Sequence, residues 1–137
     1  MNHEVSIIVP IYNEINSLNS LCHKLKDTFK HLKIKYIFVD DGSKDGSLSW
    51  LKNNLELIFS KKEFELIILK KNFGKGYAVK EGIKKTEGKY TIFLDSDLEY
   101  EPRDVLEMYH VVRENTNINV LYGSRNVGSK ISRSYRI

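Results

Sequence analysis

The feature that most constrains the fold is a regular alternation of apolar, β-branched runs with stretches of helical periodicity. We expect strands at residues 5–9, 36–39, 64–69, 90–94 and 120–122, and these runs are almost continuously apolar. Between them, apolar residues recur at the three- and four-residue spacing of a helix with one buried face. Strands of this kind, joined by helices, are typical of a parallel sheet covered on both faces. The sequence therefore predicts an α/β protein, a three-layer α/β/α arrangement around a mostly parallel, Rossmann-like sheet.

Proline and glycine mark the expected element ends. Pro10 has no amide hydrogen to donate, so we expect it to end the first strand. The third helix should turn Val79 and Ile83 inward and stop near Gly88, where a glycine suits the position after a helix. Pro102 suits the first turn of the fourth helix.

Length and composition indicate one globular domain. The 137 residues are 41% hydrophobic and 29% charged, enough for one core and too few for two ordinary domains. The 22 basic and 18 acidic residues leave a net charge of +4, which suits an anionic substrate, a membrane surface or simply a lysine-rich exterior. Arginine and aromatic residues do not interleave, so no nucleic-acid partner is expected. Without a leader-like start or an apolar run of membrane-spanning length, we expect a cytoplasmic chain, at most in peripheral contact with the cytoplasmic face of a membrane.

The cysteine and histidine content disfavours two kinds of site. Cys22 is the only cysteine, which excludes an internal disulfide, and its position on a helical apolar face predicts a buried hydrophobe and not a nucleophile. The four histidines lack the paired spacing of zinc ligands.

Polar residues follow every expected strand. Ligands of an open parallel sheet bind outside the carboxyl ends of its strands. The groups found there, in chain order, are Tyr12, Asn13 and Glu14; Asp40 and Asp41; Asn72 and Lys75; Asp95 and Asp97; and Ser124 and Arg125. After the second strand, Ser43 or Asp45 can also cap the helix that follows. The sequence therefore predicts a polar site along one sheet edge.

Asp95 and Asp97 are the strongest indication of a metal. Two carboxylates one residue apart repel each other unless a cation or a proton intervenes. A hard divalent ion, Mg²⁺ or Mn²⁺, is the simplest partner for them. No Gly-x-Gly-x-x-Gly follows the first strand and no Walker motif is present, so a bound phosphate would be neutralised mainly by the metal and by Lys75 or Arg125.

These motifs resemble, in order and spacing, those of the family 2 glycosyltransferases of GT-A fold. The likeness is greatest to the branch that includes dolichyl- and polyprenyl-phosphate mannosyl- and glucosyltransferases, and it rests on residues 5–14, 39–43, 72–76, 95–100 and 122–125. The resemblance implies a nucleoside-diphosphate sugar donor, UDP- or GDP-linked. The residues implied around its base and ribose are Pro10, Tyr12, Glu14, Val39 and Asp41, with Asp41 accepting a hydrogen bond from the base. For Tyr12, packing in the core is the alternative.

The resemblance also assigns roles to the later motifs. Asp95 and Asp97 would form the family's Asp-x-Asp motif, with Asp97 as the main metal ligand and Asp95 nearer the ribose or sugar. Ser96 stands where the family often has alanine. Lys75 and Arg125 would face the donor's phosphate or sugar, the alternatives being an exposed loop charge for Lys75 and a surface ion pair for Arg125.

The implied reaction is an inverting transfer to a glycan or to a polyprenyl phosphate. Residues 1–125 would form the nucleotide-sugar-binding catalytic domain, and residues 126–137 a basic tail that begins an acceptor-side region the chain lacks. Two other functions stay open: a donor-binding fragment without turnover, and a phospho-acceptor signalling domain, although the latter needs its acid pair after the first strand. We also expect the sheet's last strand to favour self-association into a homo-oligomer.

Overall fold

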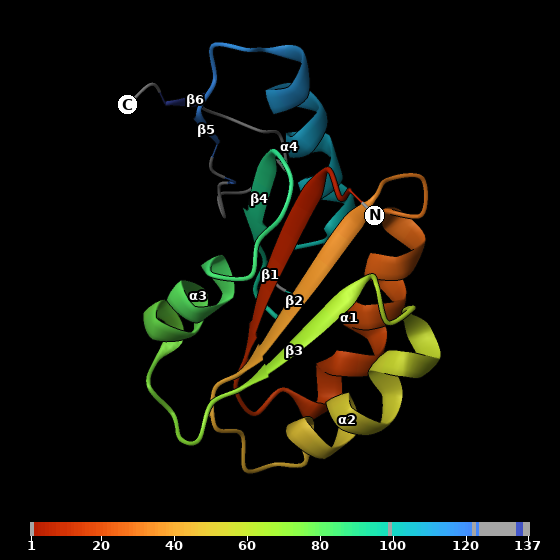
Figure 1. The fold of residues 1–137 in the computed structure, drawn as a ribbon, viewed down its shortest axis with the longest axis vertical. Coiled ribbons are helices and arrows are strands. Elements are labelled where there is room, and N and C mark those ends of the chain that lie inside the picture. Colours follow the sequence, from red (N-terminus) through yellow and green to blue (C-terminus); the bar gives the residue numbers. More distant parts are fainter. Residues whose placement is uncertain (1, 99, 122, 124–133, 136–137) are drawn as a thin grey trace. The chain divides into compact units, whose positions relative to one another are not determined.

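The computed structural model describes residues 2–98, 100–121, 123 and 134–135, in two compact units, Met1–Glu99 and Tyr100–Ile137. The first unit contains a four-stranded parallel sheet in the order β3-β2-β1-β4 (Figure 1). Its strands are β1 (Val5–Ile11), β2 (Ile34–Asp40), β3 (Phe64–Ile68) and β4 (Tyr90–Phe93). The helices that connect consecutive strands are α1 (Ile15–Thr28), α2 (Ser47–Ile58) and α3 (Lys75–Ile83).

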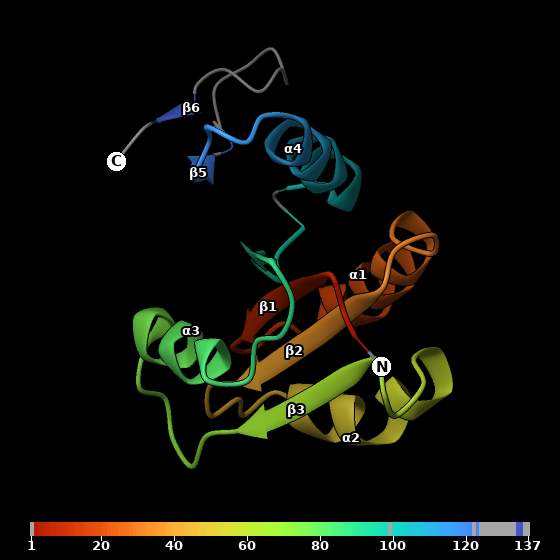
Figure 2. The same cartoon turned by 45° about the horizontal axis from the view of Figure 1, so that its top comes forward.

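The strand order decides which face each helix covers. Right-handed crossovers from β1 to β2 and from β2 to β3 place α1 and α2 on one face of the sheet. The connection from β3 to β4 runs back past two strands, so α3 lies on the opposite face (Figure 2). The predicted α/β class, with helices on both faces of a mostly parallel sheet, is confirmed.

β1 is a central strand, and all seven of its residues are buried. The prediction that Pro10 ends it is wrong, because the strand continues to Ile11. The Ile11 carbonyl accepts from the Asp41 amide on the β2 side (2.8 Å), and the Ile8 carbonyl accepts from the Leu94 amide on the β4 side (3.0 Å). Since alternate residues of a parallel strand face opposite neighbours, the nitrogen of Pro10 faces the β4 side, beyond the last β1 residue that pairs with β4. Its missing N–H therefore costs no ladder hydrogen bond.

The face beneath α1 and α2 carries the larger part of the core. The Phe59 ring lies 4.6 Å from the Tyr36 ring and 5.7 Å from the Phe38 ring, centroid to centroid, and all three side chains are buried. Cys22 is fully buried on α1, as predicted, and burial raises the pKa of its thiol to about 12. The cysteine is thus a hydrophobic core residue.

α3 packs more closely on the sheet than its periodicity predicts. We expected Val79 and Ile83 to face inward, but the buried residues are Ala78 and Gly82, and Ile83 is 48% exposed. A Cβ atom on Gly82 would lie 2.6 Å from Cγ2 of Ile8, so the helix backbone rests directly on β1. Small residues permit this approach, and a search for large apolar side chains overlooks them.

The end of α3 also differs from the prediction. The helix stops at Ile83, well before Gly88, which we expected just after it. Gly88 has a φ of 86°, and a Cβ there would lie 2.5 Å from the Glu4 carbonyl oxygen. The glycine therefore serves the close passage of the connecting segment over the start of β1.

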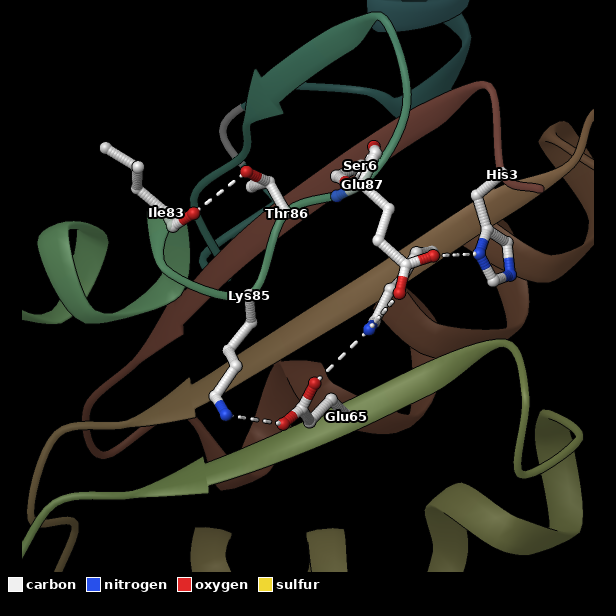
Figure 3. Close-up of polar contacts among 8 residues, drawn as sticks. His3, Ser6, Glu65, Ile83, Lys85, Thr86 and Glu87 are labelled. Carbon is white, nitrogen blue, oxygen red and sulfur yellow. Dashed lines mark hydrogen bonds and ion pairs between the residues drawn. The ribbon is translucent and has the colours of Figure 1, made fainter. Parts of the chain in front are cut away.

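That segment, residues 84–89, carries a polar network that ties it to β1 and β2 (Figure 3). The Ser6 hydroxyl donates to the Glu87 carbonyl (2.6 Å), and the Glu87 amide donates to the Ser6 hydroxyl oxygen (2.7 Å). The Glu87 carboxylate pairs with His3 Nδ1 (2.7 Å) and Lys35 Nζ (2.9 Å). These hydrogen bonds, first from His3 and then from Lys35, hold the pKa of Glu87 at about 2.

The second unit contains α4 (Pro102–Glu114), which begins with Pro102 as predicted. The fifth strand expected at residues 120–122 is present as β5 (Val120–Leu121), but its expected place in the parallel sheet is wrong. β5 pairs in antiparallel fashion with β6 (Ser134–Tyr135) in a separate sheet. Residue 122 lies outside the described residues. An apolar run indicates a strand but does not identify its partner, and β6 lies in a stretch without clear periodicity. Across the described ranges, no helix combines the length and apolar character needed to cross a membrane.

Candidate functional site

The candidate site is the carboxyl edge of the parallel sheet in the first unit. The strand order reverses direction between β1 and β4, and such a switch point is where open α/β sheets bind ligands. The loops after β1, β2, β3 and β4 all reach this edge. Of the site residues predicted from the sequence, Pro10 and Val39 lie within β1 and β2, Lys75 is the first residue of α3, and the residues that follow strand ends are Tyr12, Glu14, Asp41, Asp95, Ser96 and Asp97. Arg125 lies outside the described residues.

Asn13 joins the loop after β1 to the loop after β2. Its amide donates to the hydroxyl oxygen of Ser43 (3.0 Å), and its side-chain oxygen accepts from the Lys44 amide (2.8 Å). The φ of Asn13 is 52°, a left-handed conformation that asparagine tolerates better than most residues. Asn13 thus holds the turn that presents Tyr12 and Glu14.

The start of α1 is held by residues from the second loop. The Glu14 amide donates to the Ser47 hydroxyl oxygen (3.0 Å), and the Ile15 amide donates to Asp45 Oδ2 (3.1 Å). Asp45 also accepts the first amide of α2, from Ser47 (2.9 Å). The N-cap position is Gly46, so neither Ser43 nor Asp45 occupies the capping position expected from the sequence. Burial would raise the pKa of Asp45, but the hydrogen bonds from Ser47 and Ile15 outweigh it and lower the pKa.

Asp41 is buried and holds the start of α3. Its Oδ1 accepts from the Phe73 amide (2.8 Å) and its Oδ2 from the Gly74 amide (3.0 Å). Negative charge is favourable at a helix N-terminus. Sequence reasoning missed this role, because the contact joins residues 32 and 33 positions apart. The carboxylate retains further lone pairs, and its hydrogen bond to a base stays a prediction.

Asp40 does not share this environment with Asp41. One of its oxygens accepts from the Ser43 amide (3.2 Å), and the other has no hydrogen-bond partner within the part of the chain that the structure describes. Asp40 is fully buried. The two adjacent acids therefore serve different loops, and they do not form a paired cation site.

Lys75, at the start of α3, and Asp95, in the loop after β4, are brought together. Lys75 is the first residue of α3, and its ammonium group forms an ion pair with the Asp95 carboxylate. The Lys75 side chain is 61% exposed and that of Asp95 is 21% exposed. Asp97 is exposed, two residues further along, while Ser96 between them is buried. Opposite charges thus meet at the switch point of the sheet.

Ser17 connects the loop after β4, residues 94–98, which we call the aspartate loop, to the loop after β1. Its hydroxyl lies 2.8 Å from the Ser96 carbonyl oxygen and 3.1 Å from Glu14 Oε2. Sequence reasoning did not select Ser17, and its only signal was a hydroxyl in the first turn of α1, three residues after Glu14. The contact to Ser96 spans 79 positions and arises only because β1 and β4 are neighbours.

The remaining predicted residues differ in exposure. Pro10 and Val39 are register partners on adjacent strands and both are buried. Val39 lies in the hydrophobic cluster with Ile8, Ile37 and Ala78 beneath α3. Tyr12 is 44% exposed, which disfavours the alternative of core packing. Contact of these three with a nucleotide stays a prediction.

The aspartate loop suits a metal that shares its ligands with a substrate. No group of three or more His, Cys, Asp or Glu side chains comes together in the described portion of the chain. Mg²⁺ in nucleotide sites commonly uses one or two carboxylates and takes its other oxygens from phosphates and water. Asp95 and Asp97 fit that arrangement, and Lys75 supplies a nearby positive charge.

Comparison with known proteins gives a consistent result. The sequence model described as "Glycosyl transferase family 2" matches residues 6–136. The chain is 36% identical over 134 residues to a dolichyl-phosphate beta-glucosyltransferase of Dictyostelium discoideum, covering 90% of this chain and 40% of that protein. It is 35% identical over 105 residues to an undecaprenyl-phosphate 4-deoxy-4-formamido-L-arabinose transferase of Pseudomonas fluorescens (strain Pf0-1), covering 75% and 30%.

Among solved structures, the fold matches the mannosyltransferase PcManGT from Pyrobaculum calidifontis in complex with GDP-Man and Mn²⁺. The TM-score is 0.67 at 22% sequence identity, over 86% of this chain and 34% of that one. The chain therefore spans less than half the length of each of these three proteins.

Proposed function

Because the chain belongs to glycosyl transferase family 2, we propose that it forms the donor-binding part of a metal-dependent, inverting glycosyltransferase. The donor is a nucleoside-diphosphate sugar, UDP- or GDP-linked, and the acceptor is a polyprenyl phosphate. The observation that carries the proposal is the ion pair of Lys75 with Asp95, which joins the loops after β3 and β4 close to the exposed Asp97. A metal-bound diphosphate requires both charges: a cation that pairs with its oxygens, and carboxylates that bind its metal ion.

The loops after β1 and β2 would hold the nucleoside. Tyr12 offers an exposed aromatic ring to the base. Asp41 is fixed in one position by two backbone amides and would accept a hydrogen bond from the base. Glu14, Pro10 and Val39 would line the ribose side.

The aspartate loop would hold the diphosphate end of the donor. Asp97 is the main candidate ligand for Mg²⁺ or Mn²⁺, with Asp95 beside it, and a bound ion would stabilise the negative charge of the departing nucleoside diphosphate. When the donor binds, the Lys75 ammonium group would leave its ion pair with Asp95 and pair with a phosphate oxygen, while the buried Ser96 keeps the loop in place. The name of the solved relative, a complex with GDP-Man and Mn²⁺, supports this donor class and ion.

The acceptor is inferred from names and from acid–base chemistry. Two relatives are named as a dolichyl-phosphate beta-glucosyltransferase and an undecaprenyl-phosphate 4-deoxy-4-formamido-L-arabinose transferase. A phosphate monoester has a second pKa of about 6, so its oxygen is already ionised at neutral pH and can attack without a general base. A sugar hydroxyl would need one. In the transfer, the phosphate oxygen bonds to the anomeric carbon from the side opposite the diphosphate, whose bond to that carbon breaks.

We extend the proposal to the parts of the chain outside the described residues. Residues 1–125 are assigned to nucleotide-sugar binding and residues 126–137 to a basic tail that begins the acceptor side. Arg125 would be a second cation for the donor. It and most of that tail lie outside the described residues.

Calorimetric titration of the chain with UDP- and GDP-sugars, with and without Mn²⁺, tests the proposal. We expect metal-dependent binding of one donor class, weakened by more than about tenfold in Asp97→Asn, since a charged ligand contact is lost. Glu56→Gln is the matched control, because Glu56 is an exposed acid on α2. If neither donor class binds to well-folded protein, the proposal is wrong.

A second candidate is a donor-binding fragment without turnover, favoured by the small share of its relatives that the chain spans. Release of nucleoside diphosphate over time distinguishes the two. Steady release that depends on Asp97 would exclude the fragment, while tight donor binding without release would support it.

A further inference from the structure

The positive charge of the chain is concentrated in residues 70–85. This segment runs from the loop after β3, through α3, to Lys85 just after the helix, and it contains six lysines and one acid, Glu81. The rest of the chain has 16 basic and 17 acidic residues. The net charge of +4 therefore comes from one short segment of the first unit.

The outer face of α3 combines this charge with exposed apolar side chains. Because Ala78 and Gly82 face the sheet, helical geometry turns Tyr77, Lys80 and the Ile83–Lys84 pair outward. Tyr77 is 42% exposed and Ile83 is 48% exposed. A soluble helix normally presents its polar side outward, so two large apolar groups among lysines need an explanation.

The loop before α3 extends the same surface. The Phe73 ring stacks on the Tyr77 ring, with centroids 4.5 Å apart and planes 24° apart, and the Lys71 ammonium lies 5.0 Å from the Phe73 ring centroid. Phe73 is itself 37% exposed. We call this surface the α3 patch; its residues are Lys71, Phe73, Tyr77, Lys80, Ile83 and Lys84.

The composition of the patch identifies the kind of partner. Its cations are all lysines, and residues 70–85 contain no arginine. Specific recognition of phosphopeptides and nucleic acids relies on the planar, bidentate arginine fork, whereas lysine acts as a point charge on a flexible apolar stem. Lysines around aromatic and aliphatic side chains are typical of surfaces that lie at the boundary of an anionic bilayer. One acid weakens the patch, since Glu81 pairs with Lys84 (2.7 Å).

We propose that the α3 patch docks on an anionic lipid surface. Phe73, Tyr77 and Ile83 enter the headgroup region, and the patch lysines lie among the acidic headgroups. Because α3 begins at Lys75, which is paired with Asp95, docking brings the carboxyl edge of the sheet to the membrane. Only this last consequence, access to a lipid-phosphate acceptor, rests on the proposed function.

Co-sedimentation with vesicles tests the docking directly. We expect the chain to bind phosphatidylcholine vesicles that contain phosphatidylserine, not to bind pure phosphatidylcholine vesicles, and to dissociate at high salt. Each lysine near such a surface changes the partition coefficient about fivefold, so the triple variant K71Q/K80Q/K84Q should bind about a hundredfold more weakly. The matched control is the triple variant K52Q/K61Q/K62Q, which changes three exposed lysines on α2 and just after it. Its vesicle affinity should stay within about twofold of wild type, because α2 lies on the opposite face of the sheet.

The apolar part of the patch has its own variant. Tyr77→Ser with Ile83→Ser keeps every charge and should weaken vesicle binding by about tenfold or more, because less apolar surface is buried. Far-UV circular dichroism establishes that each variant is folded. The proposal is overturned if wild type does not prefer anionic vesicles, or if the control triple variant loses as much binding as the patch variant.

Two further outcomes keep the conclusions separate. The first is that the chain binds heparin as tightly as it binds vesicles, and that the Tyr77→Ser and Ile83→Ser changes do not weaken heparin binding. This result would assign the patch to a soluble polyanion and overturn the lipid proposal. Donor titrations on the same preparations report on the proposed function. Vesicle binding without donor binding would support docking and reject only the transferase proposal, and the reverse result would reject only docking.

Discussion

Replacement of Asp41 by alanine should destabilise the first unit and free the start of α3. The carboxylate accepts the amides of Phe73 and Gly74, at 2.8 and 3.0 Å, from a position that is 3% exposed. Each hydrogen bond to a charged group contributes about 1.5–3 kcal/mol, so the pair has an upper limit of about 3–6 kcal/mol. Since both donors lie near the surface and can bond to water after the change, we expect a loss of about 2–4 kcal/mol in the free energy of unfolding.

Urea unfolding, followed by the fluorescence of the single tryptophan, Trp50 on α2, measures this loss in the first unit. Asp41→Asn should lose about half as much, because its carbonyl oxygen can keep one amide. Asp27→Ala is the control, as that side chain is 83% exposed and its ion pair is worth at most about 1 kcal/mol.

Amide hydrogen exchange locates the effect. Protection of the Phe73 and Gly74 amides should fall in Asp41→Ala more than that of the β1 and β2 amides. A loss below about 0.5 kcal/mol, or unchanged protection at Gly74, would refute the reasoning that the carboxylate holds the start of α3.

Three other perturbations have outcomes set by the structure. Gly82→Val places a side chain against Ile8 and should lower the free energy of unfolding by about 1–3 kcal/mol. Gly76→Ala, where a Cβ meets nothing within 4 Å, should leave the free energy of unfolding unchanged or raise it by up to about 1 kcal/mol. Urea unfolding midpoints compare the two variants, and equal midpoints would contradict the close packing of α3. Since the pKa of Glu87 is lowered from 4.5 to about 2, the carboxylate contributes fully to stability above pH 4.5, and this contribution declines as the pH falls toward 2. The difference in unfolding free energy between wild type and Glu87→Gln should therefore become smaller over that range. A difference that does not change with pH would show that the carboxylate is unpaired. With its pKa raised to about 12, Cys22 should react with a thiol reagent at mildly alkaline pH only after unfolding, and immediate labelling of the native protein would show that it is not buried.

Much of the site could be located before the structure was known. Parallel strands bring their carboxyl ends to one edge, so loops with Glu14, Asp41, Lys75 and Asp95 could be assigned to one place from sequence order alone. The ion pair of Lys75 with Asp95 agrees with that reasoning. Ser17 was overlooked, because a serine in a first helical turn has many ordinary roles and its partner Ser96 is 79 positions away.

Three predictions from the sequence were wrong because each depended on how a segment packs against the rest of the chain. Pro10 was expected to end β1 because, without the strand order, the sequence does not show whether its nitrogen faces a paired strand. Ala78 and Gly82 were overlooked as the inner face of α3, because periodicity arguments weigh large side chains and this helix packs through its backbone. β5 was assigned to the parallel sheet because a short apolar run does not state its partner.

The sequence by itself determined the alternation of strands and helices, the polar edge, the family and the burial of Cys22. These depend on local periodicity and on residue types at strand ends, which each segment carries independently. The tertiary structure alone decided that Asp41 holds the start of α3, that Ser17 supports Ser96, and that the lysines and aromatic rings around α3 share one exposed surface. Such contacts join segments through the order β3-β2-β1-β4, and that order follows from how the whole chain packs.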